Sequence, residues 1–166
     1  NNVSDVREET GMYKNYFIVS SVRDPGNLGT IIRNANALGI DELIISADCA
    51  DIYNPRTVRA AMGALFRQKI TVCRDIISAV SVLREMGYCV LAAALSQSSV
   101  SITNVDVSCR TCFLIGNEGH GLDGELINAC SGSVIIPMQN GCESLNAAAA
   151  AAILMWESAK KHGFNE

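Results

Sequence analysis

The chain carries six consecutive alanines at positions 147–152, directly after a polar loop at 136–146 with the sequence I-P-M-Q-N-G-C-E-S-L-N. Alanine has the highest helix propensity and almost no side-chain bulk. The run therefore predicts a helix over 146–161 that another backbone or a ligand can approach very closely. A β-prone stretch at 133–136 precedes the loop, and such strand–loop–helix junctions are where open α/β proteins hold ligands.

Two more polar segments follow stretches that predict strands. One is V-R-D-P-G-N-L-G-T-I-I-R-N-A-N-A-L-G at 22–39, and the other is F-L-I-G-N-E-G-H-G-L at 113–122. A helical pattern follows each of them. Loops at the carboxyl ends of parallel strands converge at one edge of the sheet, where a site can form. For the loop before the alanines, the alternative is that Ser144 only caps a core helix.

Strand and helix patterns alternate along the whole chain of 166 residues, which fits one domain. Strands are predicted at 17–22, 42–46, 68–72, 88–93, 112–115 and 133–136, and helices at 28–38, 55–62, 76–86, 123–129 and 146–161. This order predicts an α/β fold with a mainly parallel sheet that helices cover on both faces. Residues 1–15 are polar and aperiodic and are predicted to be a linker or N-terminal arm, which leaves 16–166 as the folded domain.

At the three polar segments the chain resembles the SpoU-type RNA ribose 2′-O-methyltransferases of the SPOUT class. The resemblance lies in Asn27, Gly29 and Arg33 of the first segment, in I-G-N-E-G-H-G-L of the second, and in I-I-P-M followed by E-S-L-N-A in the third. These motifs stand in the family's order and at its spacing, and they span nearly all of residues 16–157. One departure is Ala61, near which the family often has a serine.

The resemblance implies that 16–166 is a SPOUT catalytic domain with a C-terminal deep trefoil knot, in which the last helix passes through a preceding loop. A threaded helix has to be thin, which suits the alanine run. It also implies a homodimer with the active site near the subunit interface. The implied reaction transfers a methyl group from S-adenosyl-L-methionine to a ribose 2′-hydroxyl of rRNA or tRNA. Because this cofactor carries its own activated carbon, the protein has to hold it and align the nucleophile.

Four residues are predicted to bind the cofactor by resemblance. Gly116 ends a strand and lets the main chain approach the adenosine. Leu95 follows another strand and lines the same pocket. Ile136 and Leu145 supply backbone contacts and apolar walls, and plain core packing is the alternative for both.

Five residues are predicted to act at the reacting end: Arg33, Asn27, Glu118, Ser144 and Asn146. A guanidinium does not release its proton in proteins, so Arg33 is expected to stabilise the developing alkoxide or an adjacent phosphate. Asn27 and Glu118 are expected to orient Arg33, while Ser144 and Asn146 position the nucleotide or fix the loop. The alternatives are a solvent-facing Arg33 and a Glu118 that is only an acid in the first turn of a helix.

The chain is acidic, with a formal net charge of −4, whereas a basic surface normally supplies most of the affinity for RNA. Arg56, Arg59 and Arg67 form the local basic cluster, for which a solvated helix face is the alternative. Many members of the resembled family carry a separate RNA-binding domain ahead of this one. We therefore expect the chain to be the catalytic half of a longer protein.

No apolar stretch reaches the ~18 residues of a membrane span, and no signal peptide opens the chain. The seven cysteines, an odd number, indicate reduced thiols and a cytoplasmic location. Cys109 and Cys112 form an isolated C-x-x-C without a second pair at zinc-binding spacing, so no metal site is predicted.

Two functions of other classes compete with methyl transfer. A dinucleotide-dependent enzyme is disfavoured because the glycines at 116, 119 and 121 do not have G-x-G-x-x-G spacing. The second is a catalytically inactive cofactor- or RNA-binding module of the same fold. The joint presence of all five reacting-end residues argues for an active enzyme.

Overall fold

A computed structural model describes residues 13–96, 98–117, 119, 121–140 and 144–163. Its centre is a seven-stranded sheet with the order β3-β2-β1-β6-β4-β7-β5, in which each pairing between these strands is parallel. The strands are β1 (Tyr16–Val19), β2 (Glu42–Ser46), β3 (Lys69–Cys73), β4 (Cys89–Ala93), β5 (Val100–Ser101), β6 (Thr111–Ile115) and β7 (Gly132–Ile135). The predicted parallel α/β sheet is confirmed.

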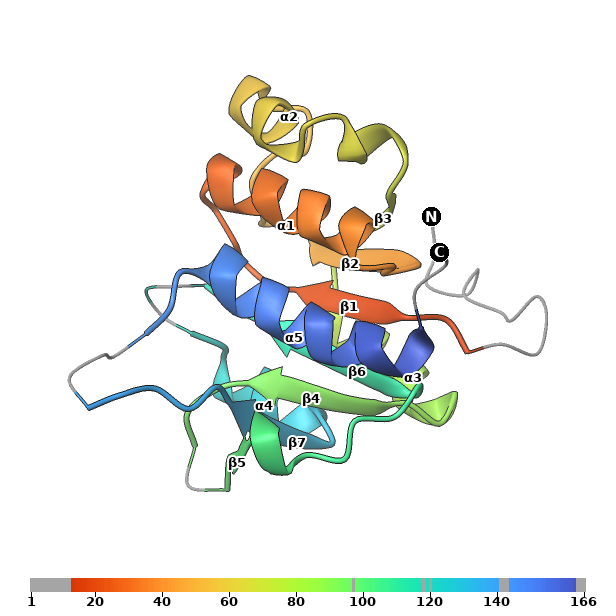
Figure 1. Ribbon diagram of the computed structural model, residues 1–166, viewed down its shortest axis with the longest axis vertical. Helices are drawn as coiled ribbons and strands as arrows, with labels where there is room; N and C mark the ends of the chain where they lie inside the picture. The colour runs from red at the N-terminus through yellow and green to blue at the C-terminus, as the bar shows by residue number, and fades with distance from the viewer. Residues whose placement is uncertain (1–12, 97, 118, 120, 141–143, 164–166) are drawn as a thin grey trace.

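Helices cover both faces of this sheet, as predicted (Figure 1). On one face lie α1 (Pro25–Ala37) and α5 (Ala147–His162), with α2 (Pro55–Ala61) beside α1. On the other face lie α3 (Ile76–Glu85) and α4 (Gly124–Ala129). Two short 3₁₀ helices, η2 (Ala64–Phe66) and η3 (Ile102–Asn104), complete the described elements. Among the described helices, none has the length and apolarity to cross a bilayer.

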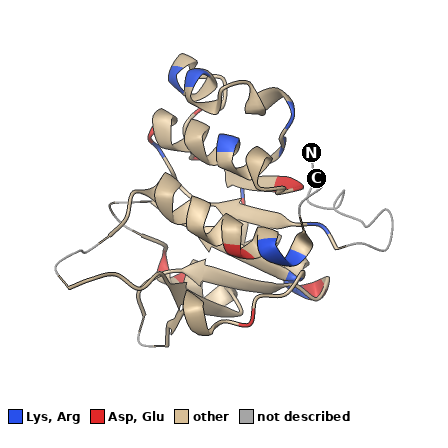
Figure 2. Ribbon diagram, viewed as in Figure 1, with Lys and Arg blue, Asp and Glu red and all other residues tan. Residues whose placement is uncertain are grey.

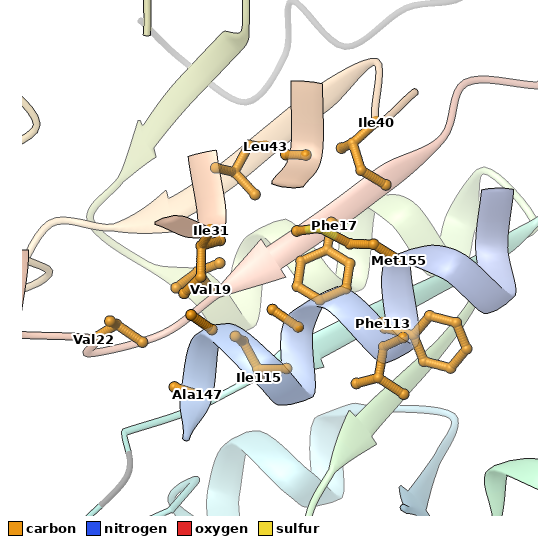
Figure 3. Close-up of a cluster of buried hydrophobic side chains, with 14 of the residues drawn as sticks. Phe17, Val19, Val22, Ile31, Ile40, Leu43, Phe113, Ile115, Ala147 and Met155 are labelled. Carbon is orange, nitrogen blue, oxygen red and sulfur yellow. The ribbon is translucent and has the colours of Figure 1, made fainter. Parts of the chain in front are cut away.

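The sheet carries a separate hydrophobic core on each face. Phe17 and Val19 of β1 point toward α1 and α5 and pack with Phe113 and Ile115 of β6 (Figure 3). The alternate residues of the same strands point to the opposite core under α3 and α4. Since both faces are covered, β1, β2 and β6 are buried along their whole length. Full burial of each large side chain stabilises the fold by roughly 1.5–3 kcal/mol.

Each of the five described α-helices starts after an aspartate or asparagine whose side chain accepts a backbone N–H of the first turn. These N-caps are Asp24, Asn54, Asp75, Asp123 and Asn146. Such a cap contributes about 1 kcal/mol because it satisfies an amide that the helix leaves unpaired. The side chain that caps α5 belongs to Asn146, so the alternative that Ser144 is this cap was wrong.

Several predicted boundaries differ from the structure. The strand predicted at 17–22 ends at Val19, because Ser21 has a φ of 58° and turns the chain out of the extended region. The helix predicted from 28 begins at Pro25, since Asp24 caps it and proline suits the first helical position. Strand β5 has two residues, too few for any alternation to be visible in the sequence.

The last residue of the predicted N-terminal arm belongs to the packed fold. Asn15 is buried, and its side-chain oxygen accepts a hydrogen bond from the Ser158 hydroxyl at 2.7 Å. Its backbone N–H donates to an Asp41 carboxylate oxygen at 2.6 Å. Residues 1–12 of the arm lie outside the described residues.

Helix α2 packs against α1 at a glycine. A Cβ atom on Gly29 would lie 2.4 Å from the Thr57 carbonyl oxygen and 2.7 Å from the Ala60 Cβ. Ala61, where the resembled family often has a serine, is fully buried in the same contact. The glycine in the first motif therefore allows two helix backbones to touch.

We expect Gly29→Ala to lower the free energy of unfolding by about 1–3 kcal/mol, because the added methyl meets backbone atoms that cannot rotate away. Urea denaturation followed by circular dichroism measures this change. Gly124→Ala is the matched control, since a Cβ there meets nothing within 4 Å, and it should stay within about 0.5 kcal/mol of the wild type. Equal stability of the two variants would contradict the tight α1–α2 contact.

Candidate functional site

A cleft of about 360 Å³ lies at the carboxyl ends of β4 and β6, against the first turn of α5. This volume is in the range of small-molecule sites. Three of the four predicted cofactor residues line it: Leu95, Gly116 and Leu145. Ile136 is not among the lining residues and packs, half-buried, against the core under α1 and α5. Leu95 is 90% exposed, an unusual degree for a leucine beside a cleft.

The loop after β6 closes tightly over the strand end. The Gly121 N–H donates to the Asn117 carbonyl oxygen at 2.9 Å. A Cβ on Gly116 would lie 2.7 Å from the Gly121 carbonyl oxygen and 2.6 Å from the Leu122 Cδ2. Gly116 is therefore required by the loop itself, in addition to the predicted approach of the main chain to a ligand.

The alanine run of α5 lies between the cleft and α1. Ala147 and Ala150 line the cleft, and the Ala148 carbonyl oxygen accepts a hydrogen bond from the Asn34 side chain of α1 at 3.4 Å. The close approach predicted from the alanines is thus seen on the side of α5 that contacts α1, while the side that lines the cleft stays a prediction.

The loop between β1 and α1 is held in a strained turn. The Ser21 hydroxyl donates to Asp48 at 2.7 Å, and its N–H donates to the Ser46 hydroxyl at 2.8 Å. The side-chain N–H of Asn117 donates to the Ser21 carbonyl oxygen at 2.9 Å. Hydrogen bonds from Ser21 and then Ser46, together with the charge of Arg23, hold the pKa of Asp48 below its usual value. These hydrogen bonds of Ser21 offset the free-energy cost of its left-handed backbone conformation.

Asn27 and Asn146 join the first and third loops. The Asn146 side-chain N–H donates to the Asn27 side-chain oxygen at 2.9 Å. The Asn146 oxygen accepts the N–H groups of Ala148 and Ala149 at 2.9 and 3.2 Å, so one amide both caps α5 and holds Asn27. With the bond between Asn117 and Ser21, the three predicted loops contact one another at the carboxyl edge, as predicted.

The other predicted reacting-end residues lie in different places. Ser144 is exposed and lines the cleft. Arg33 is exposed on α1, six residues and roughly 9 Å along the helix from Asn27, and it is not among the residues that line the cleft. Glu118 lies outside the described residues.

Asn117 is a site residue that the sequence analysis did not single out. It lines the cleft and connects two loops through its side chain. The sequence contained a signal for Asn117, because a side-chain amide that closely follows a buried strand and lies next to a glycine can reach a neighbouring loop at the strand end. No cluster of three or more metal-ligating side chains occurs within the described part of the chain.

Comparison with known proteins places the chain in a family. The family model described as "SpoU rRNA Methylase family" matches residues 14–156. The chain is 35% identical over 149 residues to the Bacillus subtilis "23S rRNA (guanosine(2553)-2'-O)-methyltransferase RlmP", covering 90% of this chain and 59% of that protein. It is also 35% identical over 141 residues to the Streptomyces viridochromogenes "23S rRNA (uridine(2479)-2'-O)-methyltransferase", covering 82% of this chain and 49% of that protein.

Two solved structures are similar to this fold and contain AdoMet. An AdoMet-bound rRNA methyltransferase from Sinorhizobium meliloti has a TM-score of 0.86 and 33% identity, covering 99% of this chain and 62% of that one. The SpoU methyltransferase AviRb from Streptomyces viridochromogenes with AdoMet has a TM-score of 0.78 and 30% identity, covering 91% of this chain and 61% of that one. The chain thus spans between about half and three-fifths of these relatives' lengths.

We expect Asn146→Ala to lower the free energy of unfolding by about 1–2 kcal/mol, because α5 loses the acceptor for two N–H groups. Asn146→Asp keeps a good N-cap acceptor and should stay within about 0.5 kcal/mol. Urea denaturation of both variants tests this. A loss of the same size in Asn146→Asp would show that the bond to Asn27, and not the cap, carries the stability.

Proposed function

Because this chain belongs to the SpoU rRNA methylase family, we propose that it transfers a methyl group from S-adenosyl-L-methionine to a ribose 2′-hydroxyl of rRNA or tRNA. The observation that carries the proposal is the cleft at the ends of β4 and β6, where three of the predicted cofactor residues meet. Incubation with labelled S-adenosylmethionine and total cellular RNA, followed by nucleoside analysis, tests it. Cofactor binding without transfer would indicate the inactive binding module instead.

The described residues fit this cofactor. The cleft walls are mainly apolar, and main-chain groups are accessible at Gly116, where a side chain cannot fit. Leu95 and Leu145 supply apolar surface for a purine ring, and burial of the exposed Leu95 is a favourable consequence of binding. When bound, the cofactor supplies an activated methyl group.

The chain's own residues then align the nucleotide. Ser144, which lines the cleft, and Asn146, two residues later, are proposed to position the ribose. Arg33 stabilises negative charge that develops on the 2′-oxygen or fixes the adjacent phosphate, since a guanidinium offers several donors and keeps its charge. Asn27, six residues before Arg33 in α1, and Glu118, outside the described residues, are proposed to orient Arg33.

A homodimer brings Arg33 to a cleft. Arg33 is exposed on α1 and is not among the residues that line the cleft of its own subunit. On the adjacent α5, Ala149, Ile153 and Trp156 are spaced three to four residues apart and exposed, which gives an apolar face beside α1. We place the partner subunit on this face, so that Arg33 of one subunit serves the cleft of the other.

Two further properties belong to this proposal. The chain from β7 to α5 has to pass the carboxyl ends of β4 and β6, and we propose that it forms the deep trefoil knot there; an experimental chain trace tests this. We also propose a cytoplasmic location, where RNA substrates and reduced thiols occur together. The six cysteines that the structure describes are all free, and cell fractionation tests the location.

We expect Gly116→Ala to weaken S-adenosylmethionine binding by at least about 10-fold, because its Cβ collides with the Gly121 carbonyl and opens the loop. Isothermal titration calorimetry measures the affinity. Gly119→Ala in the same loop is the control, since a Cβ there comes no closer than 3.4 Å to a neighbour. Undiminished affinity in folded Gly116→Ala would remove this loop from the cofactor site.

We expect Arg33→Ala to keep cofactor affinity and to lose methyl transfer by at least ~100-fold, the usual effect of removing one charge-stabilising donor. Mixing subunits tests the shared site. A heterodimer of Arg33→Ala with Gly116→Ala contains one intact site only if Arg33 acts across the interface, so mixing should restore activity. Light scattering should give about twice 17.7 kDa. A monomeric active protein, or no restoration in confirmed heterodimers, would contradict the shared site.

A further inference from the structure

The segment around α2 presents a row of exposed arginines and large apolar side chains. Arg56 and Arg59 lie about one turn apart on α2, Tyr53 lies just before the N-cap of this helix, and Met62 and Phe66 follow its last residue, so the five residues form a row along this segment of the chain. The exposed fractions of Tyr53, Met62 and Phe66 are 71%, 67% and 81%. The opposite side of α2 is buried against α1, so this row faces solvent.

The charge of this segment opposes that of the rest of the chain. Residues 52–68 contain three arginines and no acidic residue, a net charge of +3 in a chain of net −4. The remaining residues therefore carry −4 − (+3) = −7. Figure 2 shows that the charged residues drawn on α2 are all basic. A polyanion is attracted to this face and repelled from much of the remaining surface.

Two of the arginines are available for a new partner. Among the residues that the structure describes, no carboxylate lies within 4.0 Å of Arg59. Arg56 is 3.6 Å from Asp24, and its side chain is still 70% exposed. An exposed pair of this kind contributes little, so a phosphate can compete for Arg56.

The turn after α2 is strained in a way that exposes its apolar side chains. Met62 has a φ of 50°, which is rare for a residue with a side chain, and Gly63 follows with a φ of 81°. The turn leads directly into η2, which ends at Phe66. An exposed aromatic ring beside arginines is the usual arrangement for stacking on unpaired bases.

This surface is connected to the cleft. Arg56 contacts Asp24, and Asp24 accepts the Asn27 N–H at 2.8 Å. Asn27 in turn holds Asn146 at the start of α5, whose first residue lines the cleft. The first turn of α1 and its N-cap thus contact both α2 and the start of α5.

We infer that the row Tyr53, Arg56, Arg59, Met62 and Phe66, with Arg67 beside it, binds single-stranded RNA, through phosphate contacts to the arginines and stacking on the aromatic rings. This inference rests on the proposed function and adds the face on which the substrate lies. Three arginines imply a shallow salt dependence, with a slope of log K against log salt near −2.

The test uses the whole chain with S-adenosylmethionine and a fluorescein-labelled, mixed-sequence, single-stranded oligoribonucleotide, whose binding is followed by anisotropy at several salt concentrations. Arg59→Glu should weaken binding by about 3- to 10-fold and reduce the salt slope by about one. Lys161→Glu is the matched control, because it makes the same charge change in the last turn of α5 and should leave affinity within about twofold.

Variants of Phe66 distinguish stacking of the ring on a base from apolar contact alone. Phe66→Ala and Phe66→Leu should both weaken RNA binding by about 5- to 100-fold, since neither has a ring. Retention of affinity in Phe66→Leu would remove the stacking role.

Wild-type affinity for RNA in Arg59→Glu, or the absence of RNA binding by the wild type, would overturn the inference. So would a change of mass in light scattering at unchanged RNA affinity, which would identify the row as a protein interface. Calorimetry with S-adenosylmethionine reports separately on the proposed function, so failure of the two can be told apart.

Discussion

Hydrogen bonds between side-chain amides and loop groups hold the functional edge of this protein together. All pairings between the described strands of the sheet are parallel, so the loops after β1, β6 and β7 emerge at one edge without any ladder between them. Asn117 ties the second loop to the first through Ser21, and Asn146 ties the third loop to the first through Asn27. Each of these bonds joins residues that are far apart in sequence, so they depend on the finished sheet.

Close backbone approach is the second requirement of the same edge. The glycine at 29 lets α2 touch α1, the glycine at 116 lets its loop close, and the alanines let α5 lie against both α1 and the cleft. Bulk at any of these positions would separate elements whose polar bonds span less than 3.5 Å. The small residues therefore allow the backbones to lie close together, and the side-chain amides hold them there through hydrogen bonds.

Much of this organisation was predictable because periodicity and breakers mark it in the sequence. Glu42–Ser46 was predicted as it stands, since an apolar run that is too short for a helix and follows a glycine favours a strand. The strand end at Val19 was not, because a left-handed serine depends on Ser46, Asp48 and Asn117, which come later in the chain. Likewise, the place of Ile136 in the core and not in the cleft depends on packing that no local pattern encodes.

The cleft and the exposed surface of α1 and α2 differ in charge. The residues that line the cleft within the described chain are all uncharged, so none of them attracts a polyanion. In the proposed function, the positive charge that attracts RNA comes instead from Arg33, Arg56 and Arg59 on α1 and α2. Because α1 begins at the amide contact between Asn27 and Asn146, the helix that carries Arg33 is fixed directly to the cleft wall. In the proposed homodimer, this contact would fix where each subunit presents Arg33 to its partner.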